Sequence, residues 1–264
     1  MQIRDMDKTS EYFVGTCSHM GESDEIDAGA QRRIAWFRNV YERGLRGKVA
    51  FLDDKPMGFL YVMPIEICPW GPLGRDLLVI PCLWILNQAK SEGVGSSLII
   101  EAEKEARHQE RKGVVTIGYY HDFWFMPASF FKRVGFSEAR SRKTRPGEPF
   151  GEDAILWKVF DSSAEAPKFL KPNYQFKPVP GKVVVDLFWN TFCQTSNIEA
   201  QRVREVVAEF GDLVVINEYP AEDLAILHCY QIPRGIFING EEIGWGYEAP
   251  KEGIREAISK ALDS

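Results

Sequence analysis

The sequence predicts an α/β protein with two domains, and three observations support this prediction. Segments with the period of a strand alternate with segments with the period of a helix along most of the chain. An apolar stretch at 76–86 leads into a turn with two glycines, and a helical pattern follows at once. A segment at 162–182 contains four prolines, which are excluded from the interior of helices and strands, so it is typical of a linker.

Composition and charge limit the kinds of function that we expect. Of the 264 residues, 45% are apolar and 27% are charged, which is typical of a soluble globular protein. The net charge of −6 argues against non-specific binding to nucleic acid. No apolar run approaches the roughly 20 residues that span a bilayer, and the charged start of the chain lacks a secretory signal pattern. We therefore expect a cytoplasmic protein that binds neither nucleic acid nor a membrane, and we leave its oligomeric state open.

The cysteines favour a reducing compartment. They number five and are scattered along the chain, at Cys17, Cys68, Cys82, Cys193 and Cys229. No two of them have the C-x-x-C spacing, and no cluster of Cys and His has the spacing of zinc ligands. We expect no metal site, and unpaired thiols are typical of cytoplasmic proteins.

The linker defines the expected domains as 1–161 and 183–264. In the first domain the patterns predict a helix at 31–44, a hairpin at 48–66, a strand at 76–86, a helix after Gly95, a strand at 113–120, a short helix at 127–136 and strands at 136–143 and 154–160. The helix after Gly95 has an apolar stripe of Leu98, Ile99, Ala102 and Ala106. The basic run at 140–145 is more typical of a solvated hairpin tip than of a nucleic-acid patch.

The two glycines after the strand, Gly93 and Gly95, have two interpretations. Glycine lets the backbone turn tightly and lets an anion approach the amides, and a helix that begins there offers unpaired N–H groups and the positive end of its dipole. Glycine is also an ordinary way to connect a strand to a helix. The glycines alone fit either interpretation.

The order of elements around this turn resembles the GNAT acetyltransferase fold. The family signature is Arg or Gln, two residues, Gly, one residue, and Gly or Ala, and Lys90–Gly95 matches it except that Lys replaces the first residue. Ile85 matches the apolar residue before the loop, and Phe131–Phe136 matches a later segment that ends in Gly-Phe. The resemblance covers about the first 160 residues and implies the mixed sheet of acyl-CoA N-acyltransferases.

The resemblance implies that acetyl-CoA is the co-substrate. Its pyrophosphate would lie against Lys90 and the backbone amides of Glu92, Gly93, Val94, Gly95 and Ser96. Gly95 would lack a side chain because the phosphate presses on the backbone there. The pantetheine amides would pair with the backbone of Trp84, Ile85 and Leu86, and the thioester would lie where the strands of Cys82 and Tyr119 part.

Catalytic groups are less well defined. Phe131 stands where many family members have a tyrosine that protonates the leaving thiolate, so the resemblance leaves the acid open among Tyr119, Tyr120 and His121. An amine acceptor also needs a base, for which Glu66 and Asp76 are the candidates. The aromatic residues that could line an acceptor pocket are Trp70, Trp84, Phe123 and Trp124. All of these residues also have ordinary structural interpretations, as core-edge aromatics or solvated carboxylates.

The second domain resembles thioredoxin, in an arrangement similar to the YoaP-like domain that follows some acetyltransferases. Its expected elements are a strand from Lys182, a helix with Val203 and Val206, a strand at 212–220, a hairpin that turns at Asn239-Gly240 and a final helix with Ile254 and Ile258. The match includes Trp189, four residues before Cys193, and Pro233, where the family has a cis proline.

Cys193 is the candidate reactive thiol of the second domain. The family's C-x-x-C is reduced here to Cys193-Gln194-Thr195-Ser196, which excludes dithiol cycling within the motif. By the resemblance, Cys193 begins a helix, whose N-terminus favours the thiolate, and Ser196 would donate a hydrogen bond to it. We expect it to be the most reactive of the five thiols, whereas a vestigial, inert role is the alternative.

The function that these observations favour is transfer of acetyl from acetyl-CoA to an amine of a small molecule or peptide. One alternative is a CoA-binding module without catalysis, which Phe131 favours. Another is a monothiol thioredoxin-like protein that acts through Cys193.

Overall fold

The computed structural model describes residues 1–120, 125–143, 152–244 and 248–263. Its chain forms two compact units, and their boundaries differ from the expected ones. The first unit comprises residues 1–20 and 34–170, and the second comprises 21–33 and 171–264. No helix in the described part of the chain is long and apolar enough to cross a membrane.

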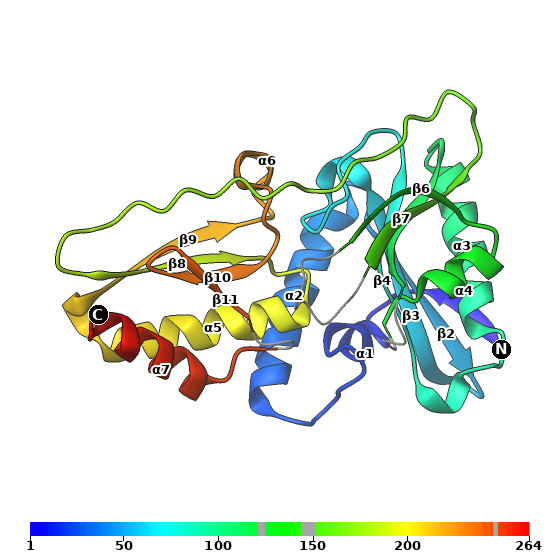
Figure 1. The fold of residues 1–264 in the computed structure, drawn as a ribbon. Coiled ribbons are helices and arrows are strands. Elements are labelled where there is room, and N and C mark those ends of the chain that lie inside the picture. The colour runs from blue at the N-terminus through cyan, green and yellow to red at the C-terminus, as the bar shows by residue number, and fades with distance from the viewer. Residues whose placement is uncertain (121–124, 144–151, 245–247, 264) are drawn as a thin grey trace. The chain divides into compact units, whose positions relative to one another are not determined.

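The first unit contains a seven-stranded mixed sheet (Figure 1). In spatial order its strands are β1 (Gln2–Asp5), β2 (Arg46–Leu52), β3 (Lys55–Pro64), β4 (Leu78–Ile85), β5 (Gly113–Tyr119), β7 (Glu152–Val159) and β6 (Ser137–Lys143). The pair β4–β5 is parallel, and the other described pairs are antiparallel.

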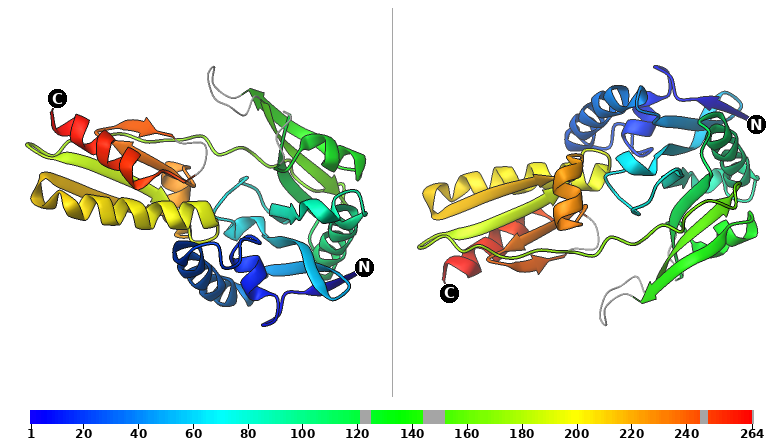
Figure 2. Two further views of the ribbon diagram at one scale, coloured as in Figure 1. Left: turned by 90° about the horizontal axis from the view of Figure 1, so that it is seen from below. Right: turned by 90° about the horizontal axis from the view of Figure 1, so that it is seen from above.

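Helices cover both faces of this sheet (Figure 2). One face packs against α3 (Val94–His108) and α4 (Ala128–Arg133), and the apolar stripe of α3 expected from the sequence is fully buried there. The other face packs against α1 (Glu11–Gly15) and the second half of α2 (Asp24–Tyr41), where Phe13 and Phe37 contact Phe59 and Tyr61 of β3. Two short 3-10 turns, η1 (Ile65–Ile67) and η2 (Asn87–Ala89), flank β4 in the chain.

Most elements expected in the first unit are present, and three features were not expected. The hairpin of β2 and β3 turns at Asp53 and Asp54, both with positive φ, as a two-residue turn requires. Two elements missing from the expectations are β1 and α1, which are only four and five residues long. Helix α2 begins at Asp24 rather than at 31.

The expected linker is anchored at both of its ends. Its first part, to Leu170, belongs to the first unit: Leu73 and Lys168 pair as a β-bridge, and Arg140 donates to the Pro167 carbonyl (2.9 Å). Arg142 donates to the Leu170 carbonyl (3.2 Å). Two residues of the basic run thus hold this segment, instead of forming only a solvated tip.

The second unit has a four-stranded sheet in the order β11-β10-β8-β9 (Figure 1). Its elements follow the expected chain order: β8 (Val183–Trp189), α5 (Gln194–Glu209), η3 (Gly211–Leu213), β9 (Val214–Pro220), α6 (Leu224–Tyr230), β10 (Gly235–Ile238), β11 (Glu241–Ile243) and α7 (Lys251–Leu262). Strand β8 is parallel to β9 and antiparallel to β10. Helices α5 and α7 bury one face of this sheet.

The opposite face of this sheet is aromatic and holds the rest of the expected linker. Tyr174 packs on Phe188 and Phe237, and its hydroxyl donates to the buried Asp186 (2.6 Å). The backbone of Asn173 donates to the Tyr230 carbonyl (2.8 Å). Residues 171–178 therefore cover a sheet face, which is why the linker boundary from proline content alone differs from the structural one.

The second unit also includes the start of α2. The fully buried Arg33 donates to the Phe192 carbonyl (2.8 Å), and Gln194 donates to the Ile26 carbonyl (2.8 Å). Arg202 of α5 forms an ion pair with Glu25 (2.5 Å). Such contacts between residues far apart in the sequence have no local sequence signal.

Candidate active site

The two central strands of the first unit separate and form a fork. Strands β4 and β5 are paired at Leu78–Val114, Val79–Val115 and Ile80–Thr116, and their described pairing ends there. Beyond this point β4 continues to Ile85 and, among the described strands, pairs with β3 alone, while β5 continues to Tyr119 and pairs with β7. The structure thus has the parting of strands that the resemblance implied beside Cys82 and Tyr119.

A β-bulge in β4 produces the fork. Val79 pairs with Met63 and Cys82 pairs with Tyr61, so two residues of β4 stand opposite one residue of β3. One of these two is Pro81, which has no N–H to donate to a ladder. A bulge bends its strand and increases the local twist, and this turns the end of β4 away from β5. At the base of the fork, the Thr116 hydroxyl donates to the Ile80 carbonyl (2.8 Å).

The open edge of β4 presents the backbone of Leu83 and Ile85. Peptide groups alternate between the two edges of a strand. The Leu86 N–H donates to the Met57 carbonyl (2.9 Å), so Leu86 and, by alternation, Trp84 face β3. Of the three residues expected to pair with pantetheine, Ile85 alone therefore faces the fork. Leu83, which the sequence analysis missed, also faces it.

The open edge leads directly to the N-terminus of α3. After η2, the turn places Ser91 and Gly93 in the left-handed region, with φ of 70° and 74°. The Ser97 N–H donates to the Gly93 carbonyl (3.0 Å), and no side chain caps the helix. The first N–H groups of a helix have no partner within it, so the amides of Val94, Gly95 and Ser96 need an acceptor from elsewhere. The side chains of Lys90, Glu92 and Ser96 are exposed around these amides.

Gly95 has a different reason to be glycine from the one expected. A Cβ at Gly95 would lie 2.9 Å from Cζ of Phe130 and 3.0 Å from Cδ1 of Ile85. Side chains of α4 and β4 thus occupy the space that we had expected the phosphate to occupy. At Gly93 a Cβ would meet nothing within 4 Å, and glycine is favoured there by the positive φ. The first turn of α3 therefore packs closely against Ile85, at the end of β4.

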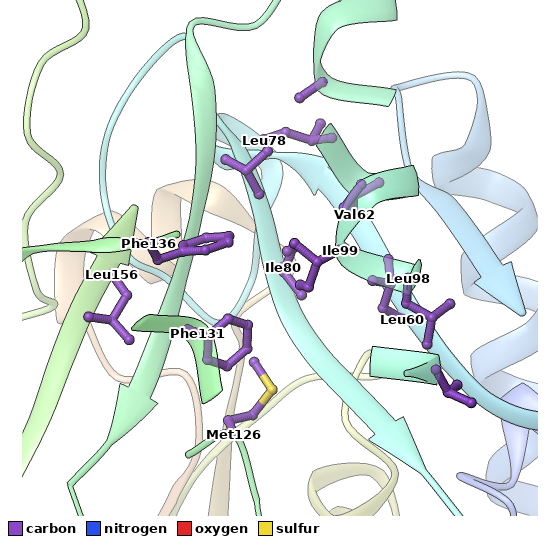
Figure 3. Packing of buried hydrophobic residues seen from close by; sticks show 14 of the residues in the cluster. Leu60, Val62, Leu78, Ile80, Leu98, Ile99, Met126, Phe131, Phe136 and Leu156 are labelled. Atoms are coloured by element: carbon purple, nitrogen blue, oxygen red, sulfur yellow. The ribbon is translucent and has the colours of Figure 1, made fainter. Parts of the chain in front are cut away.

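Phe131 belongs to the core (Figure 3). Its side chain is fully buried, and its ring lies 5.5 Å from that of Phe136. Figure 3 shows it among Phe136, Met126 and Ile80. The position at which the resemblance implies a tyrosine is therefore filled here by an apolar side chain in the core.

The two tyrosines after β5 lie in different surroundings. The Tyr120 hydroxyl donates to the carboxylate of Glu138 on β6, and Nζ of Lys132 lies 4.6 Å from its ring. Because β6 lies beyond β7, Tyr120 points away from β4. Partial desolvation and then the bond to Glu138 raise the pKa of Tyr120. These contacts hold the Tyr120 hydroxyl at Glu138.

Tyr119 remains at the fork. Its N–H donates to the Met126 carbonyl (3.0 Å), its ring lies 6.2 Å from Phe125, and it packs against the core that contains Phe131. His121, Phe123 and Trp124 lie outside the described residues. Trp70 lies in the loop that leads to the start of β4, whereas Trp84 lies on the part of β4 beyond the bulge.

The two candidate bases are at the wrong end of the sheet. Glu66 accepts hydrogen bonds from the Asp76 backbone (2.6 Å) and from Arg111 (3.1 Å). Asp76 precedes β4 and Arg111 precedes β5, so both carboxylates lie where these strands begin and are paired. The expectation that Glu66 or Asp76 serves as the base at the fork is therefore not supported, because the fork is at the other end of both strands.

Two residues that the sequence analysis missed contact the open part of β4. The Trp84 indole N–H donates to the Ser18 hydroxyl (2.9 Å), and the ring of His19 lies 6.5 Å from that of Trp84. Both residues follow α1 and are far from Trp84 in the sequence. No spacing or motif in the sequence connects them to Trp84.

In the second unit, Cys193 is half-buried and precedes α5 as its N-cap residue. Its N–H donates to Asn190 Oδ1 (2.8 Å), and Asn190 Nδ2 donates to the Pro233 carbonyl (2.8 Å). The Ser196 hydroxyl oxygen accepts from the Asn190 N–H (3.0 Å), a contact that was not expected. The one cis peptide bond in the described part of the chain joins Gly71 to Pro72, so Pro233 follows a trans bond, contrary to the expectation.

A cation lies near this thiol. Arg234 forms an ion pair with the buried Glu199 (2.7 Å). Burial opposes the charge of Arg234, but Glu199 and then Cys193 raise the pKa of Arg234. By contrast, Cys68 is fully buried, and burial raises its pKa to about 12. Cys82 is half-buried at the fork.

No family model matches this chain, and no curated protein matches it. Among solved structures, 61% of the chain is similar to 99% of a protein assigned to the GNAT acetyltransferases from Desulfovibrio desulfuricans, with 15% identity and a TM-score of 0.48. A ribosomal-protein-alanine N-acetyltransferase from Brucella melitensis matches 60% of the chain over 99% of its own length, with 17% identity and a TM-score of 0.45. A Salmonella typhimurium protein assigned as an acetyltransferase, solved with acetyl-CoA, matches 62% over 96% of its length, with 15% identity and a TM-score of 0.47. Likeness at these scores establishes neither activity nor substrate.

The burial of Phe131 predicts the effect of restoring a tyrosine. Phe131→Tyr should lower the free energy of unfolding by about 1–3 kcal/mol, because the new hydroxyl would be buried without a partner. Phe160→Tyr is the matched control, since Phe160 packs against the same core but is only half-buried, so its free energy of unfolding should fall less. Urea unfolding of both variants measures the difference. An unchanged stability of Phe131→Tyr would mean that this position can reach a polar site.

Proposed function

We propose that the first unit is a GNAT-type N-acetyltransferase that uses acetyl-CoA as its co-substrate. The observation that carries the proposal is the continuous path from the fork, along the open edge of β4, to the uncapped N-terminus of α3. These features present donors for an amide-containing chain followed by donors for an anion, in the order that pantetheine and pyrophosphate follow in coenzyme A.

The residues of this path have distinct roles in the proposal. The amides of Val94, Gly95 and Ser96 bind the pyrophosphate, and the exposed Lys90 adds a positive charge nearby. The backbone groups of Leu83 and Ile85 pair with pantetheine as an additional strand would. The thioester then lies between the parted strands, beside Cys82 and Tyr119.

Tyr119 is the acid in this proposal. It is the described tyrosine at the fork, whereas Tyr120 is bound to Glu138 and Phe131 has no proton to give. A hydroxyl at this place can protonate the CoA thiolate as the carbon–sulfur bond breaks. The acceptor is an amine of a small molecule or peptide, and its identity stays open. We do not expect a nucleic-acid or membrane partner, and a cytoplasmic setting agrees with the lack of a disulfide bond among the five described cysteines.

A CoA-binding module without catalysis is the competing proposal, and the buried Phe131 favours it. Calorimetry with coenzyme A, followed by a thiol-release screen of acetyl-CoA with amines, peptides and aminoglycosides, separates the two. Binding with release of CoA by at least one amine supports the transferase. Binding with no release for any amine supports the module, and no binding rejects both.

We propose that the second unit is thioredoxin-like and that Cys193 acts as its contact with a peptide or acceptor. The order of its strands supports this, because β9 lies at one edge of the sheet and the β10–β11 hairpin lies at the other edge. The N-terminus of α5 and the nearby Arg234 both favour a thiolate at Cys193. A monothiol redox role is the alternative, and exchange with glutathione would favour it.

A charge at the start of α3 tests the anion site directly. Ser96 is exposed in the first turn of α3, where a carboxylate suits the helix dipole. Ser96→Glu should therefore leave stability unchanged or raised, but should weaken coenzyme A binding about 10-fold or more by competing with the pyrophosphate. Ser96→Gln, of equal size and neutral, should bind nearly as the parent does. If the two variants bind coenzyme A with equal affinity in calorimetry, the anion site is not at the start of α3.

Thiol labelling tests the proposal for Cys193. Iodoacetamide at pH 7, followed by peptide mass spectrometry, should label Cys193 faster than the exposed Cys229, although Cys193 is half-buried. Cys229 serves as the internal control for simple exposure. If Cys229 or Cys17 reacts well ahead of Cys193, the helix terminus and Arg234 do not activate this thiol.

A further inference from the structure

A histidine lies beside the open part of β4, on the face away from α3. Trp84 pairs with Phe59 in the β3–β4 ladder, and directly paired residues share one face of the sheet. Phe59 packs against Phe13 of α1 (5.8 Å between ring centroids), so this face is the one that α1 covers. The His19 ring, 6.5 Å from the Trp84 ring, is therefore on the α1 side of the fork, and His19 is exposed there.

A strained but well-bonded turn holds His19 in this place. Cys17 and Ser18 have φ of 52° and 73°, a region of backbone angles that is unfavourable for residues other than glycine. The strain is offset by backbone bonds from Cys17 to Val14 (3.1 Å) and from Ser18 to Phe13 (2.9 Å). The Ser18 hydroxyl also accepts the Trp84 indole N–H (2.9 Å). The turn is thus bonded to β4 itself, two residues beyond Cys82, beside which the proposed function places the thioester.

We propose that His19 is the catalytic base that takes a proton from the acceptor amine, and this rests on the proposed transferase function. An ammonium group has no lone pair for attack, so it must first lose a proton. A neutral imidazole has a lone pair that can accept that proton. Because His19 is exposed, it can pass the proton on to water. The carboxylates Glu66 and Asp76 cannot compete, since they lie at the other end of β4.

The reaction step balances with these groups. The ammonium gives one proton to the His19 imidazole, and the nitrogen lone pair then forms a bond to the thioester carbonyl carbon. The carbon–sulfur bond breaks, and its electron pair leaves with the CoA sulfur. The thiolate takes the second amine proton, directly or by way of Tyr119, and His19 returns the first proton to water. The acceptor consequently approaches on the α1 side, against Trp84.

The variant His19→Gln tests this role. With an amine identified in the thiol-release screen, its kcat should fall about 10²-fold, while its affinity for coenzyme A in calorimetry should not change. The matched control is His108→Gln, at the exposed end of α3, which should keep the parent kcat. Added imidazole should restore part of the activity of His19→Ala. It should not restore that of Trp84→Phe, in which the His19 imidazole is still present but the bond from Trp84 to Ser18 is lost.

A measurement without turnover completes the test. In ¹⁵N-histidine NMR spectra, assigned with the His19→Gln variant, acetyl-CoA should shift the His19 resonances. A parent kcat in His19→Gln, no rescue of His19→Ala by imidazole, or an unmoved His19 resonance in the presence of bound acetyl-CoA would each overturn the assignment. Failure of the proposed function would give a different result. In that case the unmodified protein would not bind coenzyme A, or it would release no CoA from acetyl-CoA with any amine.

Discussion

The extra residue in β4 is the constraint on which the rest of the first unit depends. With Ile80 and Pro81 opposite one residue of β3, β4 bends and its pairing with β5 ends. The bulge also shifts the alternation of side chains by one residue. The side chains of Leu83 and Ile85 therefore lie on the same face of the sheet as Ile80, which is the face that packs against α3. The side chains of Cys82 and Trp84 lie on the other face, which packs against α1. One inserted residue thus opens the strand edge and separates the two faces of the fork.

The packing of α3 follows from this bend. The end of β4 reaches the first turn of α3, where only a glycine at position 95 leaves room for Ile85 and Phe130. The uncapped amides of the helix therefore lie at the end of the open edge, in a fixed relation to the fork. On the face of the sheet that packs against α1, Ser18 and His19 contact Trp84. In our account the co-substrate occupies the edge and the helix terminus, and the acceptor and its base occupy the α1 face.

Much of the fold could be predicted from the sequence because its signals are local. The apolar stripe of α3, the turn residues Asp53-Asp54 and Asn239-Gly240, and the alternation in the strands each depend on neighbours in the chain. The turn that carries Gly93 was also predictable, although the reason for Gly95 was not, because Phe130 is far from it in sequence. Pro81 in a central strand was a signal of the bulge that the sequence analysis did not use.

The surroundings of the candidate side chains were harder to predict, because they depend on partners that are far away in the sequence. Arg111 holds Glu66, and Glu138 holds Tyr120. No pattern in the sequence predicts either pair. His19 is brought to the fork by a turn whose strain is visible only in the backbone angles. The start of α2 joins the second unit through Arg33, a buried charge that the helical pattern does not distinguish from a solvated one.

A crystal structure of the protein with coenzyme A tests the central claim most directly, because it locates the co-substrate without reference to any acceptor. We predict that the pantetheine chain lies along the open edge of β4, bonded to the backbone of Leu83 and Ile85, with the pyrophosphate at the amides of Val94 to Ser96. Coenzyme A bound away from the fork, or pantetheine that does not bond to this edge, would contradict the account.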